Sequence, residues 1–368
     1  MQRLLNTSLL IFGGCFAASH AQALQGQQVE FFSEVSSFSY SDVATIKQTA
    51  DSLKGPAIRS GEFAVTANYA SFGNKIHFAN QDNYLGVKIF QRVDYYLEFT
   101  PDTAHLIYAD QNDIELSGEK DYQVDMFSNS ISASGIAAIY GGRPLDQVKL
   151  ELTLSFMEVD YMNYGRLWGN LNSLSNDAEG KLNLDYHYSD DVFFDREESG
   201  EKAKGWSVDV NASWTISPSF DISLASRDLM SEIRWDQQDR TVAQANSDRL
   251  VNTEGQLKVR PALSWIESET DIVQKLPRQI DFRQNYHLNQ NNTVGLQQYV
   301  YDSRVFFRSY YERSFNRYGR VKTYYDWSVD AFGLAYHSKL FYFDIASDSK
   351  DFEKAYTFSL SMGLNIKV

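Results

Sequence analysis

From about residue 61 to the C-terminus, apolar and polar residues alternate along the chain with a period of two. The clearest runs lie at 148–156, 182–188, 206–216 and 356–366, where every second residue is apolar. Such runs predict β-strands that have one apolar and one polar face. Runs of about ten residues are also long enough for a tilted strand to cross a lipid bilayer.

Further runs of this kind bring the predicted total to about 14 strands, with 12 to 16 left open. The predicted strands are 61–72, 84–99, 122–140, 146–160, 180–189, 205–216, 219–235, 250–265, 279–288, 293–301, 304–314, 320–330, 334–346 and 355–367, with a weaker pair between 103 and 118. Residues 163–179 are predicted to form a loop. The absence of a fixed-period repeat argues against propellers and solenoids.

The connections between these strands differ in length. Ser217-Pro218-Ser219 is a tight turn, whereas the segments 190–204 and 236–249 on either side are long and polar. Transmembrane barrels have short periplasmic turns and longer outer loops. Counting strands back from a periplasmic C-terminus gives this arrangement, although the connection at 267–279 is longer than a periplasmic turn should be.

The N-terminus has the pattern of a secretory signal peptide over residues 1–23. Arg3 is followed by a mostly apolar segment, and Ala21-Gln22-Ala23 provides a cleavage site. A buried N-terminal element and a lipoprotein anchored at Cys15 are the alternatives. Cys15 is the only cysteine, so cleavage after Ala23 would leave a mature chain without disulfides or cysteine metal ligands.

Residues 24–60 differ from the rest of the chain. Residues 29–40 could form a strand, and a helix is predicted from Ser41 or Asp42 until Gly55-Pro56. We expect a periplasmic surface segment or a plug inside the barrel, and we expect the barrel itself to occupy residues 61–368.

The chain after the predicted signal has no apolar run near 18 residues, so no transmembrane helix is predicted. A chain that crosses a membrane without such a helix must form a closed barrel. Lipid offers no hydrogen-bond partners, so every backbone N–H and C=O group must be paired within the protein. Long strands, a high strand number and aromatic residues near strand ends favour an all-β transmembrane antiparallel barrel over a periplasmic β-sandwich or binding protein. These aromatic residues are Trp206, Trp214, Trp235, Tyr286, Tyr336 and Tyr356.

The chain from Gly61 to Val368 resembles bacterial outer-membrane β-barrel proteins in this pattern. The most specific feature is the last strand, which alternates as in those proteins but ends in Val368 rather than in Phe or Trp. The resemblance implies the outer membrane of a Gram-negative bacterium, with outer-membrane lipid, lipopolysaccharide and the barrel assembly machinery as partners. It does not identify a particular porin, autotransporter or transporter family, and it leaves the oligomeric state open.

Charge and motif content narrow the function classes. The net charge of -14 argues against nucleic acid as a partner, because phosphate binding needs a basic surface. The five histidines after residue 23 lie far apart in sequence, and no HExxH, GxSxG, phosphate-loop or dinucleotide motif is present. We therefore predict no catalytic residues, no metal and no cofactor. An outer-membrane hydrolase would have only His187 with Asp185, Asp190 and Asp191 as candidates.

The candidate site is a row of charged residues on two neighbouring strands. Arg304 and Arg308 share one strand face, and Arg320, Lys322 and Asp326 share a face of the next strand, together with Asp330. We expect these residues to line the lumen, since Arg or Lys at the lipid midplane costs about 2–4 kcal/mol. Open charge rows would select solutes, whereas paired rows would close a narrow barrel.

Two function hypotheses follow. The first is a porin-like channel for small polar solutes. The alternative is a non-conducting structural, adhesive or export-assembly barrel, supported by the N-terminal segment and the long loops.

Overall fold

A computed structural model describes residues 28–78, 82–116, 119–174, 177–190, 202–251 and 257–368. These residues form one antiparallel sheet of 16 strands with a few short helices. The strands are β1 (Gln28–Ser41), β2 (Phe63–His77), β3 (Tyr84–Phe99), β4 (Lys120–Leu145), β5 (Val148–Leu174), β6 (Asp177–Tyr188), β7 (Ala203–Ser217), β8 (Phe220–Val251), β9 (Leu257–Gln274), β10 (Gln279–Asn289), β11 (Asn292–Tyr301), β12 (Arg304–Ser314), β13 (Arg320–Asp326), β14 (Ala331–His337), β15 (Phe341–Ser347) and β16 (Thr357–Lys367). The helices are α2 (Ile46–Ala50) and α3 (Pro101–Gln111), with 3₁₀ turns η1 (Asn316–Tyr318) and η2 (Phe352–Lys354). None of the described helices is long and apolar enough to cross a membrane.

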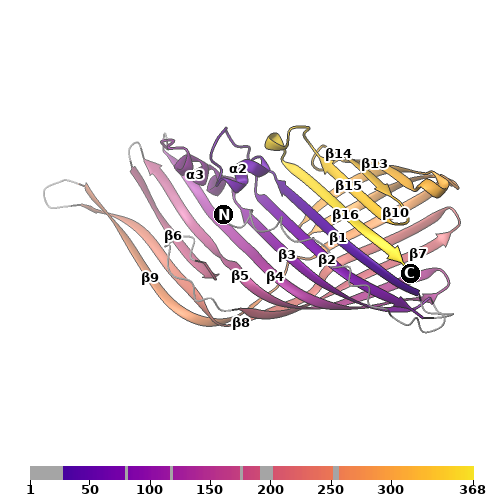
Figure 1. The fold of residues 1–368 in the computed structure, drawn as a ribbon. Helices are drawn as coiled ribbons and strands as arrows, with labels where there is room; N and C mark the ends of the chain where they lie inside the picture. Colours follow the sequence, from indigo (N-terminus) through magenta and orange to yellow (C-terminus); the bar gives the residue numbers. More distant parts are fainter. Residues whose placement is uncertain (1–27, 79–81, 117–118, 175–176, 191–201, 252–256) are drawn as a thin grey trace.

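Fourteen of the strands close into a barrel (Figure 1). β1 pairs with both β2 and β16, β7 pairs with the first half of β5, and β10 pairs with the first residues of β8. The ring therefore consists of β1–β5, β7, β8 and β10–β16. This confirms the predicted antiparallel barrel of about 14 strands.

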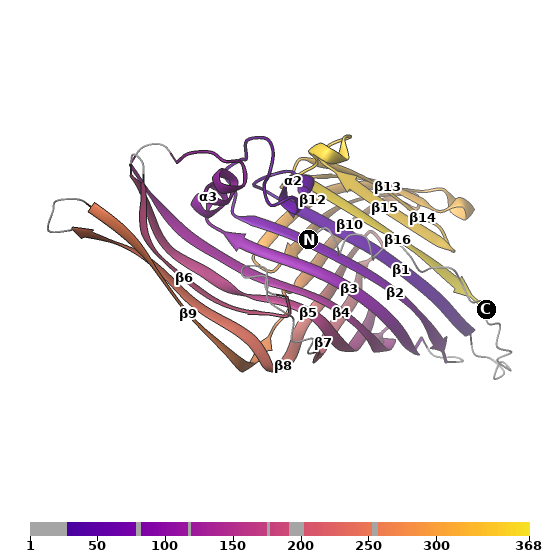
Figure 2. The same cartoon turned by 60° about the vertical axis from the view of Figure 1, so that its left-hand side comes forward.

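The other two strands, β6 and β9, belong to a sheet that protrudes from the ring (Figure 2). The second half of β5 pairs with β6, β6 pairs with β8, and β8 pairs with β9. β9 and β10 both run antiparallel to β8, so the chain continues in one direction from β9 to β10. The long connection near 267–279 is therefore not a periplasmic turn, which removes the conflict in the strand count.

Several predicted elements differ from the structure. Of the predicted loop 163–179, residues 163–174 complete β5 and residues 177–179 begin β6. The weak strand pair predicted between 103 and 118 is wrong, because residues 101–111 form α3. Thr100 caps this helix and Pro101 occupies its first turn, a helix-start signal that the strand prediction overlooked. The predicted strand 334–346 is two strands, β14 and β15. The unpredicted turn between β14 and β15 adds one reversal of chain direction, and the passage from β9 to β10 removes one. The two errors cancel, so the Ser217–Ser219 turn lies at the same end of the barrel as the C-terminus, as predicted.

The N-terminal segment also differs from its prediction. β1 is a wall strand, so the described part of the barrel begins at Gln28 rather than at Gly61, and residues 28–60 of the predicted segment 24–60 are neither separate from the barrel nor a plug. Val29 and Val368 exchange backbone hydrogen bonds of 3.1 and 2.8 Å, which join the first strand to the end of the chain. We call this the terminal end of the barrel. The predicted helix is present as α2, capped by Thr45, and lies between β1 and β2 at the far end. The predicted signal peptide and Cys15 lie outside the described residues.

The outer surface of the ring carries a continuous belt of exposed apolar side chains. Members on ten of the ring strands include Val35, Phe72, Val87, Ile136, Leu152, Trp214, Leu224, Val305, Phe332 and Leu364. Towards the far end the outer face of three neighbouring strands becomes charged, at Glu158 after Phe156, at Lys204 before Trp206 and at Glu232 after Met230. The belt therefore has a sharp edge, as expected where a lipid-facing wall enters water.

Two of the aromatic residues assigned to strand ends do not belong to this belt. Trp235 is only 1% exposed and donates to Gln274 Oε1 at 3.1 Å, on the inner side of the wall. Tyr356 precedes β16, and the guanidinium of Arg59 lies 3.8 Å from its ring centre. Period-two spacing alone does not distinguish a lipid-facing ring from an enclosed one.

Inside the barrel, several aromatic rings lie flat over a glycine of the next strand. Tyr324 is paired with Gly333 and Tyr310 with Gly295. A Cβ atom at Gly333 would lie 2.0 Å from the Cζ atom of Tyr324, so no side chain fits between the ring and the wall. The glycine holds the ring against the wall and keeps it out of the lumen centre.

Replacing Gly333 by alanine should therefore destabilise the barrel by about 1–3 kcal/mol, because the Tyr324 ring must move. The same substitution in a Tyr324→Ala background should cost much less. Urea titration of the folded protein in lipid vesicles measures both differences. Equal costs in the two backgrounds would show that the ring and the glycine are not coupled.

Candidate functional site

The five charged residues predicted to line the lumen all lie on the inner face of β12 and β13. Between them, Phe306 and Tyr310 are buried, whereas Val305 and Tyr311 of the opposite face are 57% and 41% exposed. Asp330 departs from the prediction: it lies in the turn after β13 with a φ of 53°, and it accepts a hydrogen bond from Tyr325, whose side chain belongs to the outer face.

Each of these charged side chains is paired. Arg308 Nε donates to Asp326 at 2.7 Å, and the two side chains are 13% and 1% exposed. The other pairs are Lys322 with Asp344 at 3.4 Å, Arg320 with Glu312 at 3.2 Å and Arg304 with Glu62 at 3.4 Å. Of the two arrangements considered from sequence, the structure shows the paired one.

Aromatic rings from opposite walls meet in the lumen towards the far end. The ring centre of Phe38 on β1 lies 5.4 Å from those of Tyr299 and Phe306, and Tyr96 on β3 stacks on Tyr301 at 6.0 Å. Five strands, β12–β16, separate β1 from β11 along the wall, so these contacts cross the lumen. Tyr301 is fully buried. We call Phe38, Tyr40, Phe63, Tyr96, Tyr299, Tyr301 and Phe306 the aromatic closure.

A buried charge cluster crosses the lumen beside the aromatic closure. Arg92 on β3 donates to both carboxylate oxygens of Asp228 on β8, at 2.9 and 2.8 Å, and to Asp94 at 2.7 Å. All three side chains are at most 5% exposed. We call Arg92, Asp94 and Asp228 the charge bridge.

A β-bulge places Asp228 in the charge bridge. The pairing of β7 with β8 shifts between Val208 and Val210, and Asp228 has a φ of 54°. Its backbone N–H donates to Asp209 at 2.9 Å, which stabilises the bulge. The sequence shows no sign of this bulge or of the pairing with Arg92, which is 136 residues away.

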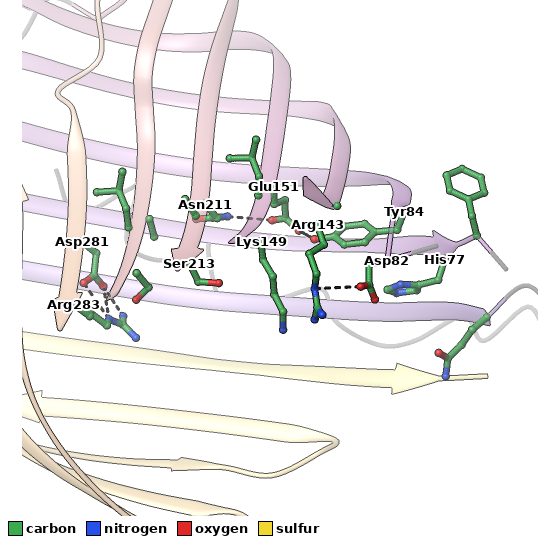
Figure 3. Close-up of a pocket in the computed structure, with 18 of the residues that line it drawn as sticks. His77, Asp82, Tyr84, Arg143, Lys149, Glu151, Asn211, Ser213, Asp281 and Arg283 are labelled. Atoms are coloured by element: carbon green, nitrogen blue, oxygen red, sulfur yellow. Dashed lines mark hydrogen bonds and ion pairs between the residues drawn. The ribbon is translucent and has the colours of Figure 1, made fainter. Parts of the chain in front are cut away.

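Among the described residues, two cavities lie in the lumen. A vestibule of about 790 Å³ opens at the terminal end, where Gln28 and Lys367 lie at its rim. Figure 3 shows its charged lining, with Arg143 paired with Asp82 at 3.1 Å and Asn211 donating to Glu151 at 3.1 Å.

The second cavity, which we call the inner chamber, has a volume of about 290 Å³. It contacts Phe38 and Tyr299 of the aromatic closure. Asp281 and Arg283 line both cavities, so the chamber is adjacent to the vestibule.

The histidine candidate for hydrolysis lies on the protruding sheet. His187 Nε2 is 3.0 Å from Thr270 Oγ1, and Asp185 pairs with Arg240 at 2.7 Å rather than with the histidine. Asp191 lies outside the described residues. Among the residues that the structure describes, no three of His, Cys, Asp or Glu are grouped as metal ligands.

A closed antiparallel barrel with an apolar belt outside and a polar lumen inside is the architecture of bacterial outer-membrane β-barrel proteins. No protein-family model matches the chain, and no curated protein matches it in sequence.

Three solved structures illustrate the similarity. The chain matches the toluene transporter TbuX of Ralstonia pickettii at 9% identity and a TM-score of 0.32, covering 93% of this chain and 88% of that one. It matches the toluene transporter TodX of Pseudomonas putida at 8% and 0.33, covering 94% and 89%. It matches the translocator domain of the autotransporter NalP of Neisseria meningitidis at 8% and 0.31, covering 94% and 89%. Because these TM-scores are low, the assignment to outer-membrane β-barrel proteins rests on the strand pairing and the apolar belt of this chain itself.

Proposed function

We propose that this protein is a solute-selective channel of the outer membrane for small polar solutes, and that the structure represents its closed state. The observation that carries the proposal is the arrangement of the lumen. A polar vestibule at the terminal end adjoins an inner chamber, and the aromatic closure blocks the way to the far end.

The closure distinguishes this proposal from a general diffusion pore. Open porins of 16–18 strands leave a water-filled channel, and barrels of eight strands are filled by side chains. This ring of 14 strands has both features, because cavities occupy part of its lumen and opposite walls touch in another part. A solute would pass only after the ring contacts separate.

Removing the aromatic closure should open the channel. We expect the variant Phe38→Ala/Tyr301→Ala/Phe306→Ala to conduct ions in planar bilayers at several times the level of the unchanged protein, because the lost rings leave a water-filled path. The matched control is Phe72→Ala/Phe156→Ala/Phe332→Ala, which removes three rings from the outer belt. Heat-modifiable gel migration establishes that each variant is folded. A folded closure variant without conductance would favour the non-conducting alternative.

The protruding sheet supports a second candidate, an adhesive or assembly barrel. β8 continues to Val251, well past the charged edge of the belt at Glu232, and within the described part of the chain β9 pairs only with β8. Such an edge offers free backbone groups for a further strand. Replacing residues 240–268 by a short turn should then abolish attachment of cells to a surface while leaving the barrel folded. Unchanged attachment would eliminate this candidate.

A further inference from the structure

The inner chamber is enclosed by more cationic than anionic side chains. Four of the residues that line it are cations, Arg227, Arg283, Arg308 and Lys322, and two are anions, Asp281 and Asp344. The carboxylates that pair with Arg308 and Arg227, those of Asp326 and Glu34, do not line the chamber. Each of the four cations has a carboxylate within 3.5 Å, but only two of these carboxylates face the cavity, so the surface presented to a solute is mainly cationic.

Two of the cations that line this chamber have hydrogen-bond donors that their paired carboxylates do not fully use. Arg308 uses only its Nε atom, for Asp326, and the structure shows no acceptor for its two Nη atoms among the described residues. Lys322 is 6% exposed, and its nearest carboxylate oxygen, on Asp344, is 3.4 Å away. Both cations lie beside the ring of Tyr324, whose centre is 5.0 Å from Lys322 Nζ and 5.5 Å from Arg308 Cζ.

Gln279 adds an independent observation. It is 7% exposed, and its Oε1 atom accepts a hydrogen bond from Tyr299 at 3.2 Å, which orients the amide. Its Nε2 atom is buried without a hydrogen-bond partner. Buried amide donors are nearly always satisfied in proteins, so an unpaired donor at a chamber wall indicates a missing acceptor.

We propose that the inner chamber is a binding site for a small organic anion. The anionic group accepts hydrogen bonds from Arg308, Lys322 and Gln279, and the rest of the molecule lies against the rings of Tyr299 and Tyr324. A cavity of about 290 Å³ suits a compact solute, since one water occupies about 30 Å³ of liquid. The inference rests on the proposed function, because it names the class of solute that such a channel admits.

Isothermal titration of the purified, detergent-folded protein tests the site. Benzoate is the probe, with inorganic phosphate, benzyl alcohol and benzylamine for comparison. We expect benzoate to bind, and benzyl alcohol and benzylamine not to bind. Absence of benzoate binding at millimolar concentration would overturn the proposal, as would equal binding of benzylamine. Binding of phosphate without benzoate would overturn the assignment to organic anions.

Two variants locate the bound anion. Lys322→Met and Gln279→Leu should each weaken benzoate binding by at least about tenfold, which corresponds to about 1.4 kcal/mol. Lys339→Met, in the exposed turn after β14, removes the same charge and should leave binding unchanged. Unchanged binding in both chamber variants would overturn the site, and heat-modifiable migration shows whether each variant is folded.

The two proposals fail in different experiments. If the protein binds benzoate but its folded aromatic-closure variant does not conduct ions, the channel function is wrong and the binding site remains. Conductance without any benzoate binding would remove the site and leave the channel.

Discussion

Replacing Arg92 by methionine should lower the free energy of unfolding of the barrel by about 3–5 kcal/mol, because it removes one partner of a buried ion pair. Methionine fills a similar volume, so little of the loss comes from a cavity. The loss arises because Asp94 and Asp228 would remain as two buried carboxylates without the guanidinium that both of them pair with. Urea titration of the protein folded into lipid vesicles, followed by tryptophan fluorescence, measures the difference.

Two further variants test whether charge is the reason. In Arg92→Met/Asp94→Asn/Asp228→Asn the unpaired charges are gone, and we expect most of the lost stability to return. The matched control is Arg234→Met, which breaks an exposed pair with Glu232 and should cost at most about 1 kcal/mol. If Arg92→Met costs no more than Arg234→Met, the charge bridge does not hold the opposite walls together.

The barrel wall could be predicted from sequence because lipid imposes a simple rule on it. At Leu150, Leu152 and Leu154 the outer face is apolar and the inner face is polar, so alternation alone reveals the strand. The same rule assigns Arg308 and Lys322 to the inner face. It could not identify their partners, because each inner position faces several candidates on the neighbouring strands and across the lumen.

The prediction failed where strands leave the lipid. The outer face of β1 carries Ser37, Ser39 and Ser41 towards the far end, so its alternation is too weak to indicate a wall strand. Residues 163–174 and 177–179 likewise lie in the protruding sheet, where β5 and β6 have no apolar belt to maintain. In water, polar residues are allowed on both faces of a strand, and the period-two signal disappears.

The charge bridge and the aromatic closure were missed for a different reason. Arg92 and Asp228 belong to strands separated by three others around the ring, and a bulge sets the direction of Asp228. Contacts across a lumen depend on the diameter and the stagger of the whole barrel, and no local pattern encodes either quantity.

A charge placed in the apolar belt should also destabilise the barrel strongly, and the membrane assignment depends on this belt. Leu152 lies in the middle of the apolar run on β5, with its side chain 40% exposed on the outer face. Replacing it by arginine should reduce the free energy of unfolding in lipid bilayers by about 2–4 kcal/mol, because the guanidinium would enter the hydrocarbon near the midplane. Urea titration in vesicles measures this cost.

Asn163→Arg is the matched control for Leu152→Arg. Asn163 lies on the same strand and also on its outer face, but beyond Glu158, where the wall has already become charged. Arginine should be tolerated there at about 0–1 kcal/mol, the cost near a membrane interface. If the belt faced water instead of lipid, Leu152→Arg would have no reason to cost more than Asn163→Arg. Equal costs for the two arginines would mean that the belt does not face lipid, and the channel proposal would fall together with the barrel's place in the membrane.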